Sequence, residues 1–291
     1  APGPDARDSG ALDPFFGTAT GPTGEHIFGV DQIGRDVFAR TVYGARVSLL
    51  VAFVATAITT LAGALAGLLA GYFRGWTDTL ISRSVDVLLA IPYLLLAAGL
   101  ASACTIGAQE GEGGCLGGAI QPGVGVVIFV ISFTSWMFMA RIVRGQVLSL
   151  REKEFIEAAK SLGASDFRII LRHIIPNAIF PTLVLASLGI GDVVLAFAAL
   201  SFLGIGTDLG YADWGQVLSF ARNWMTSLNT YWYIIVYPGI ALILFVMGWN
   251  LLGDALRDVL DPRLRGSERA AIVAEGALGT SAQARHQRSI L

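Results

Sequence analysis

The chain has 291 residues, of which 54% are hydrophobic and only 14% are charged, and its formal net charge is −2. A soluble domain of ordinary composition carries about a quarter charged residues. Several uncharged runs exceed the roughly 20 residues that an α-helix needs to cross a bilayer. The composition therefore excludes a soluble globular protein and predicts an all-α, polytopic transmembrane helical bundle.

Residues 1–46 precede the first long apolar run. Their first half is rich in Gly and Pro and lacks helical periodicity, which is typical of irregular loop. Further along, Gly34 is expected in a tight turn, and Asp36 is placed to cap an amphipathic helix that contains Phe38 and Val42. We interpret this segment as a structured loop rather than as a binding site.

Five apolar runs are candidates for transmembrane spans. They cover about residues 47–72, 87–103, 124–140, 179–206 and 233–252. In the first run, Gly63, Gly67 and Gly71 lie four residues apart on one helix face. Small residues at that spacing let two helix backbones approach closely, so this face is predicted to pack within the chain or against a partner subunit.

Asp192 is an acidic residue well inside the fourth predicted span, next to Gly189 and Gly191. An ionisable residue at membrane depth is costly, which makes Asp192 a candidate functional residue. Two roles stay open for it. The side chain either faces a solvated pathway or accepts hydrogen bonds across a subunit interface.

Cys104 and Cys115 lie near the ends of a Gly-rich segment, residues 105–121, that contains no Lys or Arg. The short separation allows a disulfide if this side of the membrane faces an oxidising compartment. Two free thiols are the alternative. A metal site is not expected, because no further Cys, His or acidic cluster accompanies the pair.

Residues 141–178 form a basic, polar segment between the third and fourth runs, with seven Lys or Arg. Two short helices fit it. The first, over about residues 150–162, ends at Gly163 in a left-handed C-cap. The second is capped by Ser165 and is expected to carry Phe167, Ile170, Leu171 and Ile174 on one apolar face. Pro176 suits the start of the next span. A polar hairpin in this position predicts a docking element for a soluble partner, and a loop that is basic only because of membrane topology is the alternative.

The distribution of Lys and Arg predicts the orientation. One side receives residues 72–86, the hairpin and the tail at 261–291, whereas the other receives the Cys-containing loop and the aromatic loop at 208–231. The positive-inside rule places the first set in the cytoplasm and residues 1–46 outside. The tail is rich in Ala, Gly, Ser and Arg and is expected to be disordered.

Several kinds of chemistry are not encoded. The Lys residues, Lys153 and Lys160, follow Glu and Ala, so the Gly-Lys pair of a P-loop ATPase is missing. His26, His173 and His286 lie far apart and fall on different sides of the predicted membrane. We therefore predict that the chain is not an enzyme and has no metal site or cofactor of its own.

Over roughly residues 25–266 the chain resembles dipeptide and oligopeptide ABC importer permeases. The docking segment resembles their EAA loop, in the residues Glu157, Ala158, Ala159, Gly163, Ile175 and Pro176. Residues 26–38 resemble the segment before the family's second span, with Val30 in place of a Thr, and residues 250–263 resemble the carboxy-terminal signature. Many of these permeases carry Glu at the position of Phe197, so the substrate stays open.

The resemblance implies a permease subunit with the type I ABC importer fold, which carries di- or oligopeptides by alternating access. It implies coupling to an ATPase through Glu157, Ala158, Ala159, Gly163, Ser165 and Asp166. The implied partners are a second, homologous permease subunit in a heterodimer, two cytoplasmic ATPase subunits or one fused ATPase, an extracytoplasmic substrate-binding protein and the lipid bilayer. No nucleic acid is expected.

ATP and Mg²⁺ are expected on the partner ATPases, and the expected location is a bacterial or archaeal plasma membrane. Members of the resembled family have six spans with a cytoplasmic start, so one more helix is expected before Ala1, which is not a Met. A permease of the same fold for nickel, an oligosaccharide or another solute is an alternative. A secondary carrier that works without ATP is a second alternative.

Overall fold

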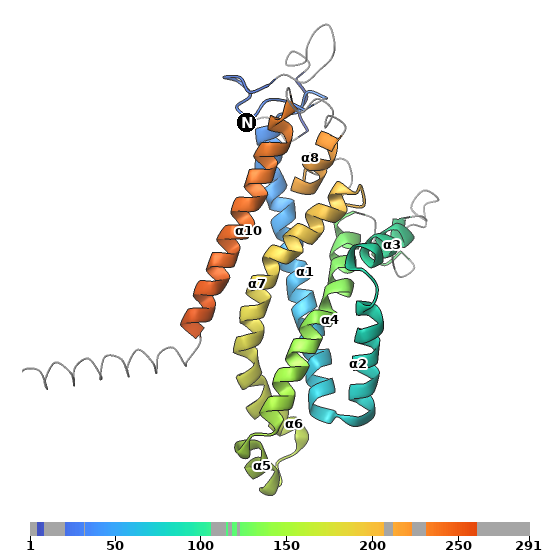
Figure 1. The fold of residues 1–291 in the computed structure, drawn as a ribbon, viewed down its shortest axis with the longest axis vertical. Helices are drawn as coiled ribbons and strands as arrows, with labels where there is room; N and C mark the ends of the chain where they lie inside the picture. Colours follow the sequence, from blue (N-terminus) through green and yellow to red (C-terminus); the bar gives the residue numbers. More distant parts are fainter. Residues whose placement is uncertain are drawn as a thin grey trace, which may run out of the picture.

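The computed structural model describes residues 5–8, 21–31, 33–105, 115, 118–120, 123–206, 212–222 and 231–260. Over these residues the chain is an elongated bundle of helices (Figure 1). The helices are α1 (Val37–Phe73), α2 (Gly75–Leu89), α3 (Tyr93–Thr105), α4 (Val124–Arg151), α5 (Glu154–Ser161), α6 (Asp166–Ile169), the π-helical turn η3 (Ile170–Ile174), α7 (Ile175–Phe202), α8 (Trp214–Ala221) and α10 (Tyr233–Leu260). The predicted tail at 261–291 lies outside the described residues.

Among the described residues, four helices are long and apolar enough to cross a membrane: α1, α4, the continuous α6–η3–α7 helix and α10. A fifth span is reached if α2 and α3 are counted together. Each long helix exceeds the span predicted for it. In particular, α1 continues without a break from the helix capped at Asp36, where the carboxylate accepts a 2.8 Å hydrogen bond from the Ala39 N–H.

The second predicted span, residues 87–103, is not one straight helix. The polar residues before it already form α2, and α2 and α3 meet at an angle of 92°. Pro92 explains the break, because it disfavours helical backbone at Ile91. Ion pairs then hold α2 along α4 instead of leaving it as a connection, with Asp78 accepting from Arg144 at 2.5 and 2.7 Å.

The glycine face of α1 packs against α4. A Cβ built on Gly63 would lie 2.6 Å from the Met139 Cβ, and one built on Gly67 would lie 2.5 Å from the Ala140 carbonyl oxygen. Only a residue without a side chain allows this approach. Of the two partners that the sequence left open, the structure therefore shows contact within the chain.

The ends of α7 and α10 differ from the predicted bounds. The span predicted to reach residue 206 ends at Phe202, because Gly204 adopts a left-handed conformation with φ 84° and the Ile205 N–H bonds to the Leu200 carbonyl. At the other end of the chain, α10 continues to Leu260, beyond the predicted residue 252. α10 runs beside α7 and contacts both α7 and α8 (Figure 1). Near the C-terminal end of α10, a Cβ built on Gly253 would lie 2.7 Å from the Leu188 side chain of α7.

The end of the bundle near α8 is held by buried polar contacts. Arg40, which is 1% exposed, donates to Asp5 at 2.7 Å and to Gln216 at 3.0 Å. Asp213 caps α8 by accepting from the Gln216 N–H at 2.8 Å. The first residues of α1 are thereby fixed to the short helix α8.

His26 joins the segment before α1 to its N-cap. Its Nδ1 lies 2.7 Å from an Asp36 carboxylate oxygen, and its Nε2 lies 3.4 Å from Asp8. The hydrogen bond to Asp36 raises the pKa of His26 above its ordinary 6.5, and this effect exceeds the opposing effect of burial. A raised pKa means that the contact stabilises fully below pH 6.5, and that this stabilisation is lost as the pH rises through the folded-state value.

We therefore expect His26→Gln to lower the thermal unfolding midpoint at a pH of about 6 and to leave it nearly unchanged at a pH of about 9. Unfolding of the purified protein, followed at both pH values in one detergent, measures the effect. His173→Gln, at the opposite end of the bundle, is the control. A deficit of the same size at both pH values would contradict the assignment.

Candidate functional site

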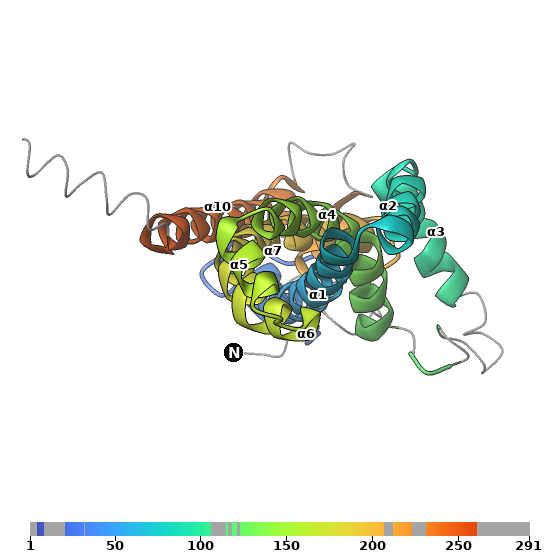
Figure 2. The same cartoon turned by 90° about the horizontal axis from the view of Figure 1, so that it is seen from below.

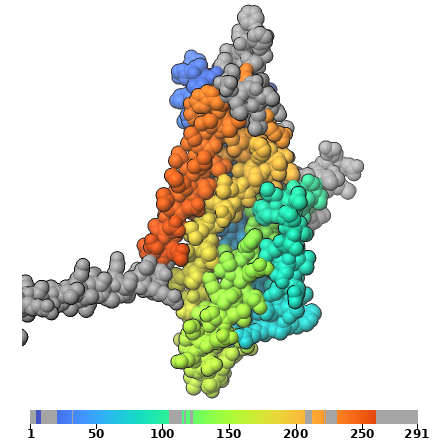
Figure 3. Space-filling view, in the orientation of Figure 1, coloured from blue at the N-terminus to red at the C-terminus, as the bar shows by residue number. Residues whose placement is uncertain are grey.

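The predicted docking segment forms a hairpin at one end of the bundle. We define the docking hairpin as residues 152–169, which comprise α5, a turn and α6. It lies opposite the end that carries α8 and is nearest the viewer when the bundle is seen from below (Figures 1 and 2). In the space-filling view the hairpin projects beyond the lower end of α2 (Figure 3).

The turn of the docking hairpin is built on Gly163. This residue has φ 76°, which is the left-handed conformation that the sequence predicted. The Gly163 N–H donates to the Lys160 carbonyl at 2.9 Å, and the Ala164 N–H donates to the Ala159 carbonyl at 3.1 Å. This pair of bonds is a Schellman motif, which satisfies the last carbonyls of α5 and turns the chain sharply.

The second helix of the hairpin is held differently from the prediction. Ser165 occupies the N-cap position of α6, but its side chain makes no capping hydrogen bond. The next residue, Asp166, accepts a 2.6 Å hydrogen bond from the Tyr72 hydroxyl near the end of α1. Asp166 therefore ties the hairpin to α1, and Ser165 contributes its backbone conformation alone.

Three isoleucines anchor the hairpin to the bundle. Ile156, Ile169 and Ile174 are completely buried in one cluster with Tyr72, Met139, Val143 and Val147. The Arg151 guanidinium adds a 2.5 Å hydrogen bond to the Tyr72 carbonyl. The ion pair between Arg74 and Glu152 is exposed and contributes little to stability. Burial thus makes the hairpin a rigid extension of α1 and α4.

The outer face of the hairpin is exposed. Glu157, Ala158, Gly163, Ser165 and Asp166 are exposed, whereas Ala159 is partly buried and packs on the isoleucine cluster. The two most exposed large apolar side chains of the hairpin are Leu162, which is 89% exposed, and Phe167, which is 71% exposed.

The exposure of Phe167 differs from the prediction. The sequence placed Phe167 and Ile174 on one apolar face of a regular helix. The π-helical turn η3 lies between them and rotates Phe167 away from the core, whereas Ile174 stays buried. Sequence reasoning missed Leu162 as a surface residue, and its place beside the turn-forming Gly163 is the only signal that could have revealed it.

Asp192 lies far along α7 from the docking hairpin. It lines a cavity of about 640 Å³ between α1, α3, α4 and α7. In Figure 3 part of α1 is visible at the bottom of a hollow between α7 and α3. Phe197, by contrast, is completely buried in the central core and is not among the residues that line this cavity.

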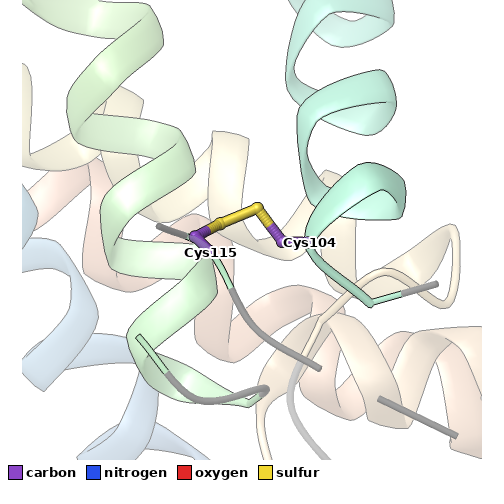
Figure 4. Close-up of a disulfide and its surroundings, with 2 residues drawn as sticks. All are labelled: Cys104 and Cys115. Atoms are coloured by element: carbon purple, nitrogen blue, oxygen red, sulfur yellow. A yellow bond between two sulfur atoms is a disulfide. The ribbon is translucent and has the colours of Figure 1, made fainter. Parts of the chain in front are cut away.

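Cys104 and Cys115 form a disulfide (Figure 4). Cys104 lies near the end of α3, and Cys115 pairs with Ile120 through backbone hydrogen bonds of 3.0 and 3.2 Å. Both cysteines are buried in the cluster that contains Val126 and Val130 of α4. The bridge therefore ties the end of α3 to the start of α4.

Residues 63–266 match the family described as "binding-protein-dependent transport system inner membrane component". The chain belongs to this family. The match begins within α1 and includes the docking hairpin, Asp192 and the residues of α3, α4 and α7 that line its cavity. The prediction of an ABC importer permease subunit, made from the EAA-like residues, is thereby confirmed.

Sequence relatives include the dipeptide transport system permease protein DppC of Alkalihalophilus pseudofirmus, which is 41% identical over 84% of this chain and 74% of its own. The glutathione transport system permease protein GsiD of Escherichia coli is 41% identical over 84% of this chain and 75% of its own length. A putative peptide transport system permease protein of Brucella suis is 40% identical over 83% of this chain and 75% of its own length.

Solved structures share the fold. An inward-facing MetNI methionine ABC transporter chain matches with a TM-score of 0.60 and 19% identity, over 76% of this chain and 96% of that one. A chain of an amino acid ABC transporter with histidines matches with a TM-score of 0.55 and 17% identity, over 75% and 92%. These similarities confirm the predicted all-α, multi-span permease fold.

Proposed function

We propose that this chain forms half of the membrane pathway of an ATP-driven importer for di- or oligopeptides. Support for the solute comes from relatives at about 40% identity over more than four fifths of the chain, whose names specify dipeptide, peptide and glutathione transport. Support for ATP coupling comes from the docking hairpin. A second, homologous permease subunit, a soluble ATPase pair and an external binding protein complete the proposed assembly.

The observation that carries the coupling proposal is the pair of exposed apolar side chains on the hairpin. Leu162 and Phe167 lie on the exposed side of the docking hairpin, which projects from the bundle. Buried isoleucines fix the inner side of this hairpin. Apolar residues exposed on a rigid, otherwise polar protrusion are typical of a protein-protein contact. The basic residues around them favour the cytoplasmic side, where the ATPases lie.

The proposed mechanism transmits movement through the hairpin. When ATP closes the two ATPases, the grooves that hold Leu162 and Phe167 move. The isoleucine cluster and the bond between Tyr72 and Asp166 pass this movement to α1 and α4. ATP then shifts the permease toward the outward-open state, because that state fits the closed ATPases better.

The test is uptake by the complete assembly in proteoliposomes. With the binding protein outside and ATP inside, we expect labelled dialanine to accumulate only when ATP is hydrolysed. Nickel and maltotriose, each offered as a competitor, should leave the rate unchanged. Uptake of nickel or maltotriose instead of the peptide would show that the solute is not a peptide. Uptake of the peptide without ATP would contradict the proposal of an ATP-driven importer.

A further inference from the structure

The cavity beside Asp192 is largely apolar, but a small set of polar side chains lies around it. Three hydroxyls in α1, those of Thr56, Thr59 and Thr60, have no hydrogen-bond partner among the described residues, and neither has the hydroxyl of Tyr93 in α3. All four residues line the cavity, and Thr56 and Thr59 are 7% and 8% exposed. Their oxygens are closed off from the cavity in this structure. Because buried hydroxyls without a partner cost free energy, turning these side chains toward a polar guest in the cavity would be favourable.

The other buried threonines in the described helices are hydrogen-bonded. Thr134 donates to the Val130 carbonyl at 2.8 Å, and Thr182 donates to the Ala178 carbonyl at 2.7 Å. The cavity threonines sit in the same kind of helix but do not make this bond. Their free hydroxyls are therefore a property of the cavity and not of threonine in a helix.

Asp192 supplies the charge of this cavity. It lies ten positions before Phe202 at the end of α7, which corresponds to about 15 Å along the axis and is well inside the helix that is apolar enough to span a membrane. In the part of the chain that the structure describes, the Asp192 carboxylate makes no hydrogen bond or ion pair, and it is the only ionisable carboxylate, Lys, Arg or His that lines the cavity. An unpaired carboxylate at this depth requires a polar or cationic partner.

We infer that the cavity between α1, α3, α4 and α7 binds the amino-terminal ammonium group of the transported peptide, with Asp192 as its counter-charge. An ammonium has three N–H donors and no acceptor. The carboxylate takes one donor, and the threonine hydroxyl oxygens accept the others once their side chains turn toward the cavity. This inference rests on the proposed peptide transport and adds the group that is recognised.

The amino terminus fits this site better than any side chain would. It is the one positive group that all unblocked peptides share, so a single carboxylate serves peptides of every sequence. The remaining walls are mainly apolar, with Phe138, Leu185 and Val193 among them, and they place no demand on a particular side chain. We therefore expect transport to depend on the positive charge at the amino terminus of the peptide and to tolerate different side chains along it.

The experiment compares trialanine with its analogue in which a hydroxyl replaces the amino group. Both are taken up by the full assembly in proteoliposomes, with wild-type, Asp192→Asn and Asp192→Glu permease. Because the binding protein is the same throughout, its own preference cancels when the amine-to-hydroxyl uptake ratio of a variant is divided by that of wild type. We expect Asp192→Asn to lower this ratio about tenfold and Asp192→Glu to retain it within about threefold.

Asp254→Asn is the matched control. Asp254 is an exposed carboxylate of α10 that lines a different groove, so its variant should keep the wild-type ratio. An unchanged ratio in Asp192→Asn would overturn the inference and assign Asp192 to subunit packing. If wild type takes up neither probe with ATP, the proposed function itself fails, which is a different result.

A second measurement needs no variant, so it tests the inference even if Asp192→Asn fails to assemble. In the wild-type complex a membrane-permeant carbodiimide should modify Asp192, as detected by mass spectrometry of the α7 peptide. Trialanine should protect the carboxylate, and the hydroxyl analogue should protect it at least about fivefold less. Equal protection by both probes would overturn the ammonium assignment.

Discussion

Leu162→Asp will abolish peptide uptake while the permease still assembles in the membrane. Leu162 is 89% exposed, so the substitution costs the isolated fold little. In the docked state it would place a charge in an apolar contact, which costs at least about 2 kcal/mol, or about thirtyfold in affinity for the ATPase. Co-purification of the ATPase and uptake in proteoliposomes measure the two effects.

Trp76→Ala is the matched control for this variant. Trp76 is 80% exposed at the start of α2 but lies outside the docking hairpin, so its loss should leave ATPase binding intact. Two more hairpin variants should uncouple hydrolysis from uptake. Ala158→Trp adds bulk on the exposed face, and Gly163→Pro is incompatible with φ 76°. Wild-type uptake by Leu162→Asp would show that the ATPases attach elsewhere.

Gly67→Val will prevent assembly altogether. A Cβ at this position would lie 2.5 Å from the Ala140 carbonyl oxygen and 2.9 Å from the Arg144 nitrogen, both of which are backbone atoms of α4. Neither can move without the whole helix, so α1 and α4 must separate. We expect a destabilisation of about 3 kcal/mol or more, because an overpacked core cannot relax here.

Gly145→Val is the control for this clash. Gly145 lies in α4, the helix that Gly67 approaches, but a Cβ there meets nothing within 4 Å. Size-exclusion profiles and thermal unfolding in detergent should show loss of folded protein in Gly67→Val and none in Gly145→Val. A monodisperse, stable Gly67→Val protein would contradict the packing of α1 on α4.

The docking hairpin shows which structural features local sequence patterns predict and which they do not. Its turn follows from Gly163 alone, because no other residue type adopts a positive φ at so little cost. Its attachment does not. Ser165 had the residue type of an N-cap, yet the decisive contact is made by Asp166 with Tyr72, which lies 94 residues earlier in the chain. Such a pairing depends on how α1 and α4 pack and has no signature in the hairpin itself.

The sequence by itself determined the long apolar helices, the cap at Asp36, the turn at Gly163 and the membership of a permease family, because each depends on residues that are neighbours along the chain. Tertiary structure decided the partner of the glycine face, the packing of α2 along α4, the contact between Asp166 and Tyr72, and the cavity around Asp192. These features arise where distant helices meet, and their energies come from packing and from polar groups that only the folded bundle brings together.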